Sequence, residues 1–128
     1  MKYLAIAGAV FGLTGVILGA FGAHALRASV SAEWLEVWKT AVSYQMYHAP
    51  ALLCLAWAGE KSTNRLLHWA GINFVLGIIV FSGSLYLLVL CNMPRLGMIT
   101  PIGGSLLILG WLLLLTSVVR QQVSVDGK

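Results

Sequence analysis

Four long apolar runs separated by short polar connections dominate the pattern of this chain. The runs cover residues 3–25, 40–58, 66–90 and 98–119, and none of them contains Asp, Glu, Lys or Arg. An α-helix rises about 1.5 Å per residue, so about 20 residues suffice to cross the hydrocarbon core of a bilayer. The pattern therefore predicts an all-α fold for residues 1–128, a single transmembrane domain of four antiparallel helices in an up-down-up-down bundle.

The composition indicates that lipid, and not water, surrounds this chain. Hydrophobic residues make up 59% of the 128 residues and charged residues only 9%, whereas a soluble domain carries about 25% charged residues. The net charge of +4 comes from eight basic residues against four acidic ones, and the basic residues are scattered singly. Scattered cations form no patch for nucleic acid. We therefore expect the lipid bilayer, and no nucleic acid, as a partner.

The basic residues also predict an orientation, because cytoplasmic loops of membrane proteins carry an excess of lysine and arginine. With four spans, the sides of the membrane hold five and three basic residues, namely Lys2, Lys61, Arg65, Arg120 and Lys128 against Arg27, Lys39 and Arg95. This difference predicts that both termini lie in the cytoplasm.

Glycines recur along the first run at steps of three and four residues, and a further pair opens the fourth run. The set expected to pack helices closely comprises Gly8, Gly12, Gly15, Gly19, Gly22, Gly103 and Gly104. A stripe of small residues lets a neighbouring backbone approach, which helps to hold helices together in lipid. We favour packing against another helix of the same chain, and the alternative is an interface between two copies.

The segment of residues 31–39 precedes the second apolar run and is amphipathic. Glu33 and Glu36 share one helical face, whereas Trp34 and Trp38, four residues apart, share the other. Tryptophans in such positions anchor helices at the membrane surface. The segment is expected either to lie flat on the membrane or to extend the second helix.

Polar side chains gather near one end of the predicted bundle, on the side of the first and third connections. The candidate cluster draws on all four spans and comprises His24, Tyr44, Gln45, His48, Ser82, Ser84, Tyr86 and Thr100. Polar groups inside lipid are costly unless they find partners. They are therefore expected to hydrogen-bond one another across helices or, as the alternative, to line a pocket that binds a small ligand.

Many of these residues lie in segments that resemble the signatures of the YgdD/YwdK family. The segments are Gly19–His24, Trp38–His48, Phe81–Tyr86 and Ile99–Gly104, which occur in the family's order and are spread over almost the whole chain. The resemblance implies a small, uncharacterised four-pass protein of the bacterial plasma (inner) membrane, and it implies no activity.

No catalytic or cofactor signature is complete in this sequence, and no carboxylate within a span could orient a histidine for acid–base work. We therefore predict a non-enzymatic protein without catalytic residues, metal or cofactor, which acts as a partner or scaffold for another membrane protein or a second copy. The first alternative is an oligomeric transporter or channel for small solutes or ions. Haem or another cofactor held by His24 and His48 is the least favoured alternative.

Overall fold

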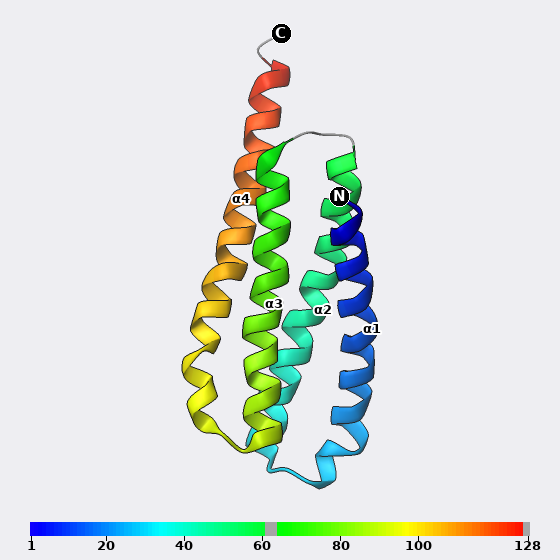
Figure 1. The fold of residues 1–128 in the computed structure, drawn as a ribbon, viewed down its shortest axis with the longest axis vertical. Helices are drawn as coiled ribbons and strands as arrows, with labels where there is room; N and C mark the ends of the chain where they lie inside the picture. The colour runs from blue at the N-terminus through cyan, green and yellow to red at the C-terminus, as the bar shows by residue number, and fades with distance from the viewer. Residues whose placement is uncertain (61–63, 127–128) are drawn as a thin grey trace.

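The computed structural model describes residues 1–60 and 64–126, which form four long helices. The elements are α1 (Lys2–His24), η1 (Leu26–Ala28), α2 (Ala32–Glu60), α3 (Arg65–Cys91), η2 (Pro94–Met98) and α4 (Thr100–Asp126), where η denotes a short 3-10 helix. Figure 1 shows the four helices side by side, with consecutive helices running in opposite directions. The prediction of an all-α chain is therefore confirmed.

Asparagine side chains mark both ends of α3. Asn64 accepts a hydrogen bond from the Leu66 amide at 2.9 Å, which satisfies one of the N–H groups left free in the first turn. Asn92 ends the helix in the left-handed conformation, with φ 52°, which asparagine adopts more readily than most residues. Pro94 then begins η2, so the chain reverses within a few residues and α4 starts beside the end of α3.

The amphipathic segment forms the first turns of α2, because that helix is continuous from Ala32. The prediction that both tryptophans anchor it at the membrane surface is wrong for Trp38, whose side chain is only 1% exposed. Its indole Nε1 donates a hydrogen bond to the Leu18 carbonyl of α1 at 2.9 Å. Gly22 of α1 leaves space for the ring, which also packs on Tyr86 of α3 with a centroid distance of 4.7 Å.

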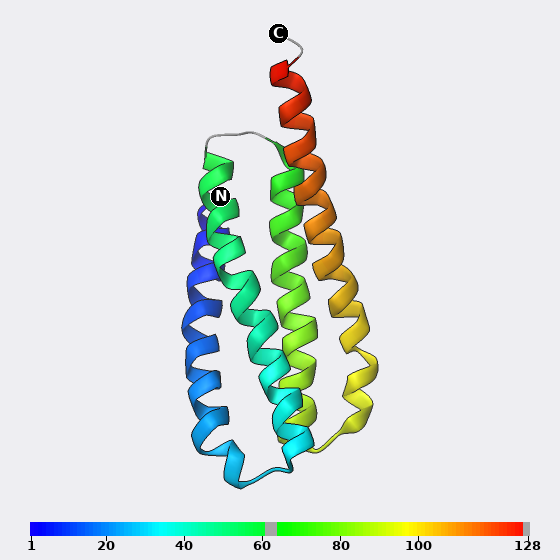
Figure 2. The same cartoon turned by 180° about the vertical axis from the view of Figure 1, so that it is seen from behind.

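The helices pack in chain order, α1 on α2, α2 on α3 and α3 on α4, with a smaller contact between α1 and α3. Within the described residues the backbones of α1 and α4 do not approach each other, and Figure 2 shows these two helices at opposite sides of the molecule. The central core is apolar and includes Leu4, Leu52, Phe74, Ile78 and Leu107. A second, smaller apolar cluster contains Leu26, Trp38 and Val89. The helices therefore form an open row with two apolar clusters in its interior.

Glycines of α1 make its contact with α2 close. Gly8, Gly15 and Gly22 stand seven residues apart, and a Cβ added at any of them would collide with an atom of α2. Gly19 lies in looser contact with the same helix, whereas a Cβ at Gly12 would meet nothing within 4 Å. The glycine spacing thus places four of the five against a helix of the same chain, and Gly12 outside this contact.

The contact between α3 and α4 uses glycine in the same way. Gly103 lies directly against the backbone of Phe81, whereas its neighbour Gly104 faces only the ring of Phe81, with an added Cβ at 3.7 Å. Gly110, which is not one of the predicted packing glycines, leaves room for the ring of Phe74. The two buried glycines of α4 are again seven residues apart, so both helix pairs repeat their small residues at the heptad spacing.

Three helical segments among the described residues are long and apolar enough to cross a membrane, namely Lys2–Ala28, Arg65–Cys91 and Pro94–Gln121. They correspond to the first, third and fourth apolar runs of the sequence. The second run, in α2, is less apolar because it contains Tyr44, Gln45, Tyr47 and His48.

Candidate functional site

Gln45 is the centre of a polar cluster that joins α1, α2 and α3. Its amide nitrogen donates hydrogen bonds to the backbone carbonyl of Phe11 and to the hydroxyl of Thr14, both at 2.8 Å. Its amide oxygen accepts a hydrogen bond from the Tyr86 hydroxyl at 2.9 Å. Gln45 is 3% exposed, and it uses both N–H groups and its oxygen to connect α2 to the helices on either side.

A second bond joins α2 to α3 one turn before Gln45. The Ser82 hydroxyl donates to the backbone carbonyl of Ala41 at 2.8 Å, and both residues are fully buried. A small residue at position 41 lets the two helices approach closely enough for a short side chain to reach a backbone oxygen. This bond fixes the relative height of α2 and α3.

His48 connects α2 to α4. Its Nδ1 lies 2.7 Å from the carbonyl oxygen of Tyr44, and its Nε2 accepts a hydrogen bond from the Trp111 indole at 3.1 Å. A carbonyl oxygen only accepts and an indole N–H only donates, so the imidazole is neutral and carries its proton on Nδ1. Phe74 of α3 contacts both rings, with centroid distances of 5.2 Å to His48 and 5.1 Å to Trp111.

A hydroxyl pair joins α3 to the first turn of α4. The side-chain oxygens of Ser84 and Thr100 lie 2.7 Å apart, and Ser84 also donates to the Phe81 carbonyl of its own helix at 2.9 Å. Since a serine hydroxyl has one proton, Thr100 is the donor within the pair. The bond holds the start of α4 next to the glycine contact at Phe81.

Two of the candidate residues stand apart from these bonds. His24 lies exposed in the last turn of α1 and takes part in none of them. Tyr44 is 40% exposed, its ring packs on Phe81 with a centroid distance of 4.5 Å, and only its backbone carbonyl bonds to His48. The structure thus distributes the other six candidates over four separate contacts between helices.

Two side chains that complete these contacts, Thr14 and Trp111, were not among the candidates predicted from the sequence. Thr14 also donates to the Val10 carbonyl of its own helix at 2.8 Å, a bond to the preceding turn that threonine often forms within helices. A signal was nevertheless present, because Thr14 is the one hydroxyl between Tyr3 and His24 in the first run. Trp111 carries the only N–H side chain of the fourth run.

Polar contacts also occur toward the opposite end of the molecule. The Tyr3 hydroxyl of α1 lies 2.7 Å from Nδ1 of His68 in α3, and Asn64 donates to the buried Ser117 of α4 at 2.7 Å. The polar groups therefore cross-link helices at both ends, although the contacts around Gln45 are the most numerous.

The chemistry of the cluster follows from how fully its atoms are paired. Among the described residues, every buried side-chain nitrogen or oxygen has a hydrogen-bond partner, and no three His, Cys, Asp or Glu side chains gather as metal ligands would. Both nitrogens of His48 are engaged, so an iron or a substrate proton could reach this ring only after one of these bonds breaks. The arrangement is suited to holding helices in register.

Comparison with known proteins gives a consistent set of relatives. The family model described as "Protein of unknown function (DUF423)" matches residues 18–104. A "UPF0382 membrane protein" of Staphylococcus aureus (strain bovine RF122 / ET3-1) is 49% identical over 116 residues, which cover 90% of this chain and 93% of the relative. The "UPF0382 membrane protein YwdK" of Bacillus subtilis (strain 168) is 40% identical over 121 residues, or 94% and 98% of the two chains. No solved structure matches the chain.

Proposed function

The chain belongs to the DUF423 family of membrane proteins, and we propose that it acts in the bacterial plasma membrane as a non-enzymatic scaffold for another membrane protein. Its resemblance to the YgdD/YwdK family is thereby confirmed by the match to YwdK itself. The membrane is its medium, and the proposal concerns what the protein does there.

One observation carries the proposal: six of the eight candidate side chains, all except His24 and Tyr44, take part in bonds between helices. Gln45 alone accounts for three such bonds. His48 adds one through Nε2 to Trp111 of α4, while its Nδ1 bonds to the Tyr44 carbonyl within α2. Each interhelical hydrogen bond in a membrane contributes about 0.6 kcal/mol on average and at most about 1.7 kcal/mol. Several of them together favour one fixed arrangement of helices, which is what a scaffold presents to a partner.

A four-pass topology requires that α2 also crosses the bilayer. Its polar side chains Gln45 and His48 are buried against the other helices, whereas Tyr47, Leu53 and Trp57 are exposed. An apolar outer face and a satisfied polar inner face make a helix compatible with lipid. We propose four crossings with both termini in the cytoplasm. A reporter domain that folds only in the cytoplasm should be active when it is fused to either terminus. A reporter that folds only outside the cytoplasm should be inactive at both termini, and its activity at either one would contradict this topology.

The alternative of a pore within one copy receives little support from the interior. Leu52, Phe74 and Ile78 fill the centre and are at most 2% exposed. A transporter or channel would therefore need an oligomer, with its path between copies. Flux of ions or small solutes through reconstituted protein would favour that alternative.

The scaffold proposal can be tested by photo-crosslinking in the native membrane. A photoreactive amino acid is placed at one exposed position on each helix, Leu13, Tyr47, Ile79 and Ile108, and at the buried Ile78 as the matched control. We expect a discrete adduct with one other membrane protein from one or two of the exposed positions, and none from Ile78. Adducts with lipid alone from all four exposed positions would contradict the proposal.

A further inference from the structure

A hollow of about 550 Å³ lies beside the connection between α1 and α2. Three charged side chains, Arg27, Glu36 and Lys39, line it together with small and aliphatic residues that include Ala23 and Leu35. Cavities that bind small molecules in proteins have volumes of about 300 to 1,000 Å³. The hollow is thus large enough for a charged group of small-molecule size, at the end of two apolar helices.

A smaller groove of about 250 Å³ adjoins this hollow, because Ala23 and Lys39 line both spaces. Gly19 and Gly22 of α1 form one side, and Trp38 and Val42 of α2 lie opposite. Residue numbers fall along α1 and rise along α2 in this direction, so the groove leads from the helix ends toward their middle. Its largely apolar lining is suited to part of a hydrocarbon chain.

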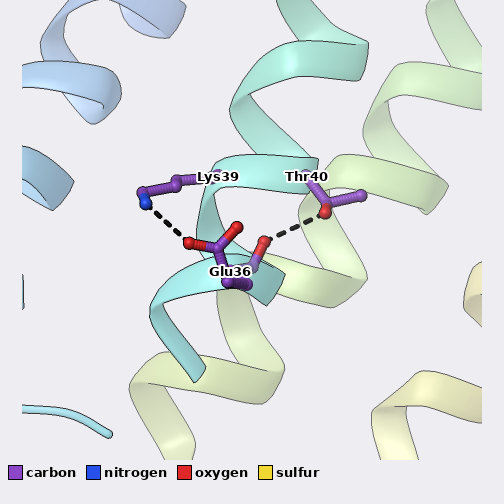
Figure 3. Close-up of polar contacts among 3 residues, drawn as sticks. All are labelled: Glu36, Lys39 and Thr40. Atoms are coloured by element: carbon purple, nitrogen blue, oxygen red, sulfur yellow. Dashed lines mark hydrogen bonds and ion pairs between the residues drawn. The ribbon is translucent and has the colours of Figure 1, made fainter. Parts of the chain in front are cut away.

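The charged rim has an excess of positive charge. Lys39 and Glu36 form an exposed ion pair at 2.6 Å, and Figure 3 shows Lys39 and Thr40 on opposite sides of Glu36. Arg27 is exposed, and in the described part of the chain it forms no ion pair. The three side chains have a net charge of +1. Because Lys39 and Glu36 pair with each other, the guanidinium of Arg27 is exposed and accessible to another anion.

We propose that the hollow and groove together bind one anionic phospholipid. Its phosphate lies at Arg27 and Lys39, and one acyl chain follows the groove past Ala23 to Gly19. A guanidinium recognises phosphate through two parallel hydrogen bonds, and basic side chains at the ends of membrane helices attract anionic headgroups. The inference rests on the membrane location of the chain and is independent of any protein partner.

Among the described residues that line the hollow, Glu36 is the one whose charge opposes the binding of an anionic lipid. Its carboxylate repels a phosphate in the same hollow and holds the Lys39 ammonium, so removal of its charge should strengthen binding. A headgroup that carries an ammonium group would show the reverse, because it would lose a carboxylate partner. Glu36→Gln therefore separates an anionic lipid from a zwitterionic one.

The experiment uses the full chain, delipidated in a mild detergent and titrated with dioleoyl phosphatidylglycerol or dioleoyl phosphatidylcholine. Native mass spectrometry counts the lipids that remain bound. We expect the first phosphatidylglycerol to bind at least about fivefold more tightly than phosphatidylcholine, and Arg27→Ala to reduce this preference about fivefold, the effect of one basic side chain near a membrane surface. Arg27→Lys should retain most of it, and Glu36→Gln should increase it.

Arg95→Ala is the matched control, because Arg95 is an exposed cation at the same end of the molecule, in η2, and does not line the hollow. Equal effects of Arg27→Ala and Arg95→Ala would overturn the proposal, since they would indicate a general surface charge. A loss of binding in Glu36→Gln, or full competition by millimolar inorganic phosphate, would also overturn it.

The groove is tested separately through Ala23, which is exposed and lines both spaces. Ala23→Phe fills their junction without altering charge or a buried contact, and it should weaken the first bound lipid of either kind severalfold. Circular dichroism and gel filtration verify that each variant remains folded. Unchanged binding in Ala23→Phe would show that no acyl chain occupies the groove.

Discussion

Trp111 of α4 donates its indole N–H to Nε2 of His48 of α2, although the backbones of these two helices are not neighbours in the described residues. Phe74 of α3 contacts both rings and supports them from the helix between. The backbone of α4 otherwise packs on α3 and η2. One side-chain bond therefore ties the last helix to the second and also sets the tautomer of the histidine.

Replacement of Trp111 by Phe removes this donor and keeps an aromatic ring over Phe74. We expect the free energy of unfolding to fall by about 0.6 to 1.7 kcal/mol, the range of an interhelical hydrogen bond in a membrane. Unfolding by sodium dodecyl sulfate in mixed micelles measures the change. Trp69→Phe is the control, because Trp69 is 54% exposed, and an equal loss in both variants would contradict a specific role for the bond.

Gln45 and Tyr86 should be energetically coupled. Tyr86→Phe removes the hydroxyl that donates to the amide oxygen of Gln45, so this oxygen stays buried without a partner. Gln45→Leu removes all three hydrogen bonds of the side chain. We expect the free energy of unfolding to fall by about 1 kcal/mol in Tyr86→Phe and by about 2 kcal/mol in Gln45→Leu. Adding Tyr86→Phe to Gln45→Leu should cost clearly less than Tyr86→Phe costs alone, because the bond is already absent.

The same unfolding assay tests this coupling, with Tyr47→Phe as the control for removing an exposed tyrosine hydroxyl. Tyr47 is 67% exposed, so its variant should lie within about 0.5 kcal/mol of the parent. Strict additivity of Gln45→Leu and Tyr86→Phe would argue against the bond.

Two glycines of α1 should respond oppositely to the addition of one methyl group. A Cβ at Gly22 would lie 2.5 Å from Cδ1 of Trp38, so Gly22→Ala should destabilise the protein by about 1 to 3 kcal/mol through overpacking. Gly12 faces open space, and Gly12→Ala should be neutral or stabilising by up to about 1 kcal/mol, because alanine loses less backbone entropy in a helix. A loss of stability in Gly12→Ala would show that a second copy or partner covers this position.

Adjacent glycines of α4 provide a second matched pair. Gly103→Ala would press a methyl group into the backbone of Phe81, which cannot move aside as a side chain can, whereas Gly104→Ala adds an ordinary contact with the Phe81 ring. We expect a loss of about 2 to 3 kcal/mol for Gly103→Ala and of less than about 0.5 kcal/mol for Gly104→Ala. Cysteine cross-linking between α3 and α4 would report whether the first variant also separates the helices.

Much of the candidate site follows from spacing along the chain. Gln45 and His48, three residues apart on one helix, must share a side, and polar groups in an apolar run must find partners. Spacing does not say which neighbour each one meets. Gln45 therefore reaches α1 and α3, while His48, only one turn further, reaches Trp111 of α4.

Trp38 shows why some assignments needed the tertiary structure. An amphipathic pattern near a membrane surface is equally compatible with an anchoring tryptophan and with a buried one. The difference depends on Gly22, sixteen residues earlier, which leaves room for the indole beside α1. The pattern of residues 31–39 alone does not show that a glycine of another helix leaves space for the Trp38 ring.

The helices, their membrane character and the need for internal hydrogen bonds can be predicted from the sequence alone, because these follow from apolar run length and from the cost of unpaired polar groups in lipid. The row-like packing of the helices, the position of Gly12 outside the α1–α2 contact and the partners of Gln45 and His48 are visible only in the folded molecule. Those outcomes depend on how two side-chain surfaces fit together, and shape complementarity between distant segments is a property of pairs of helices and not of either helix alone.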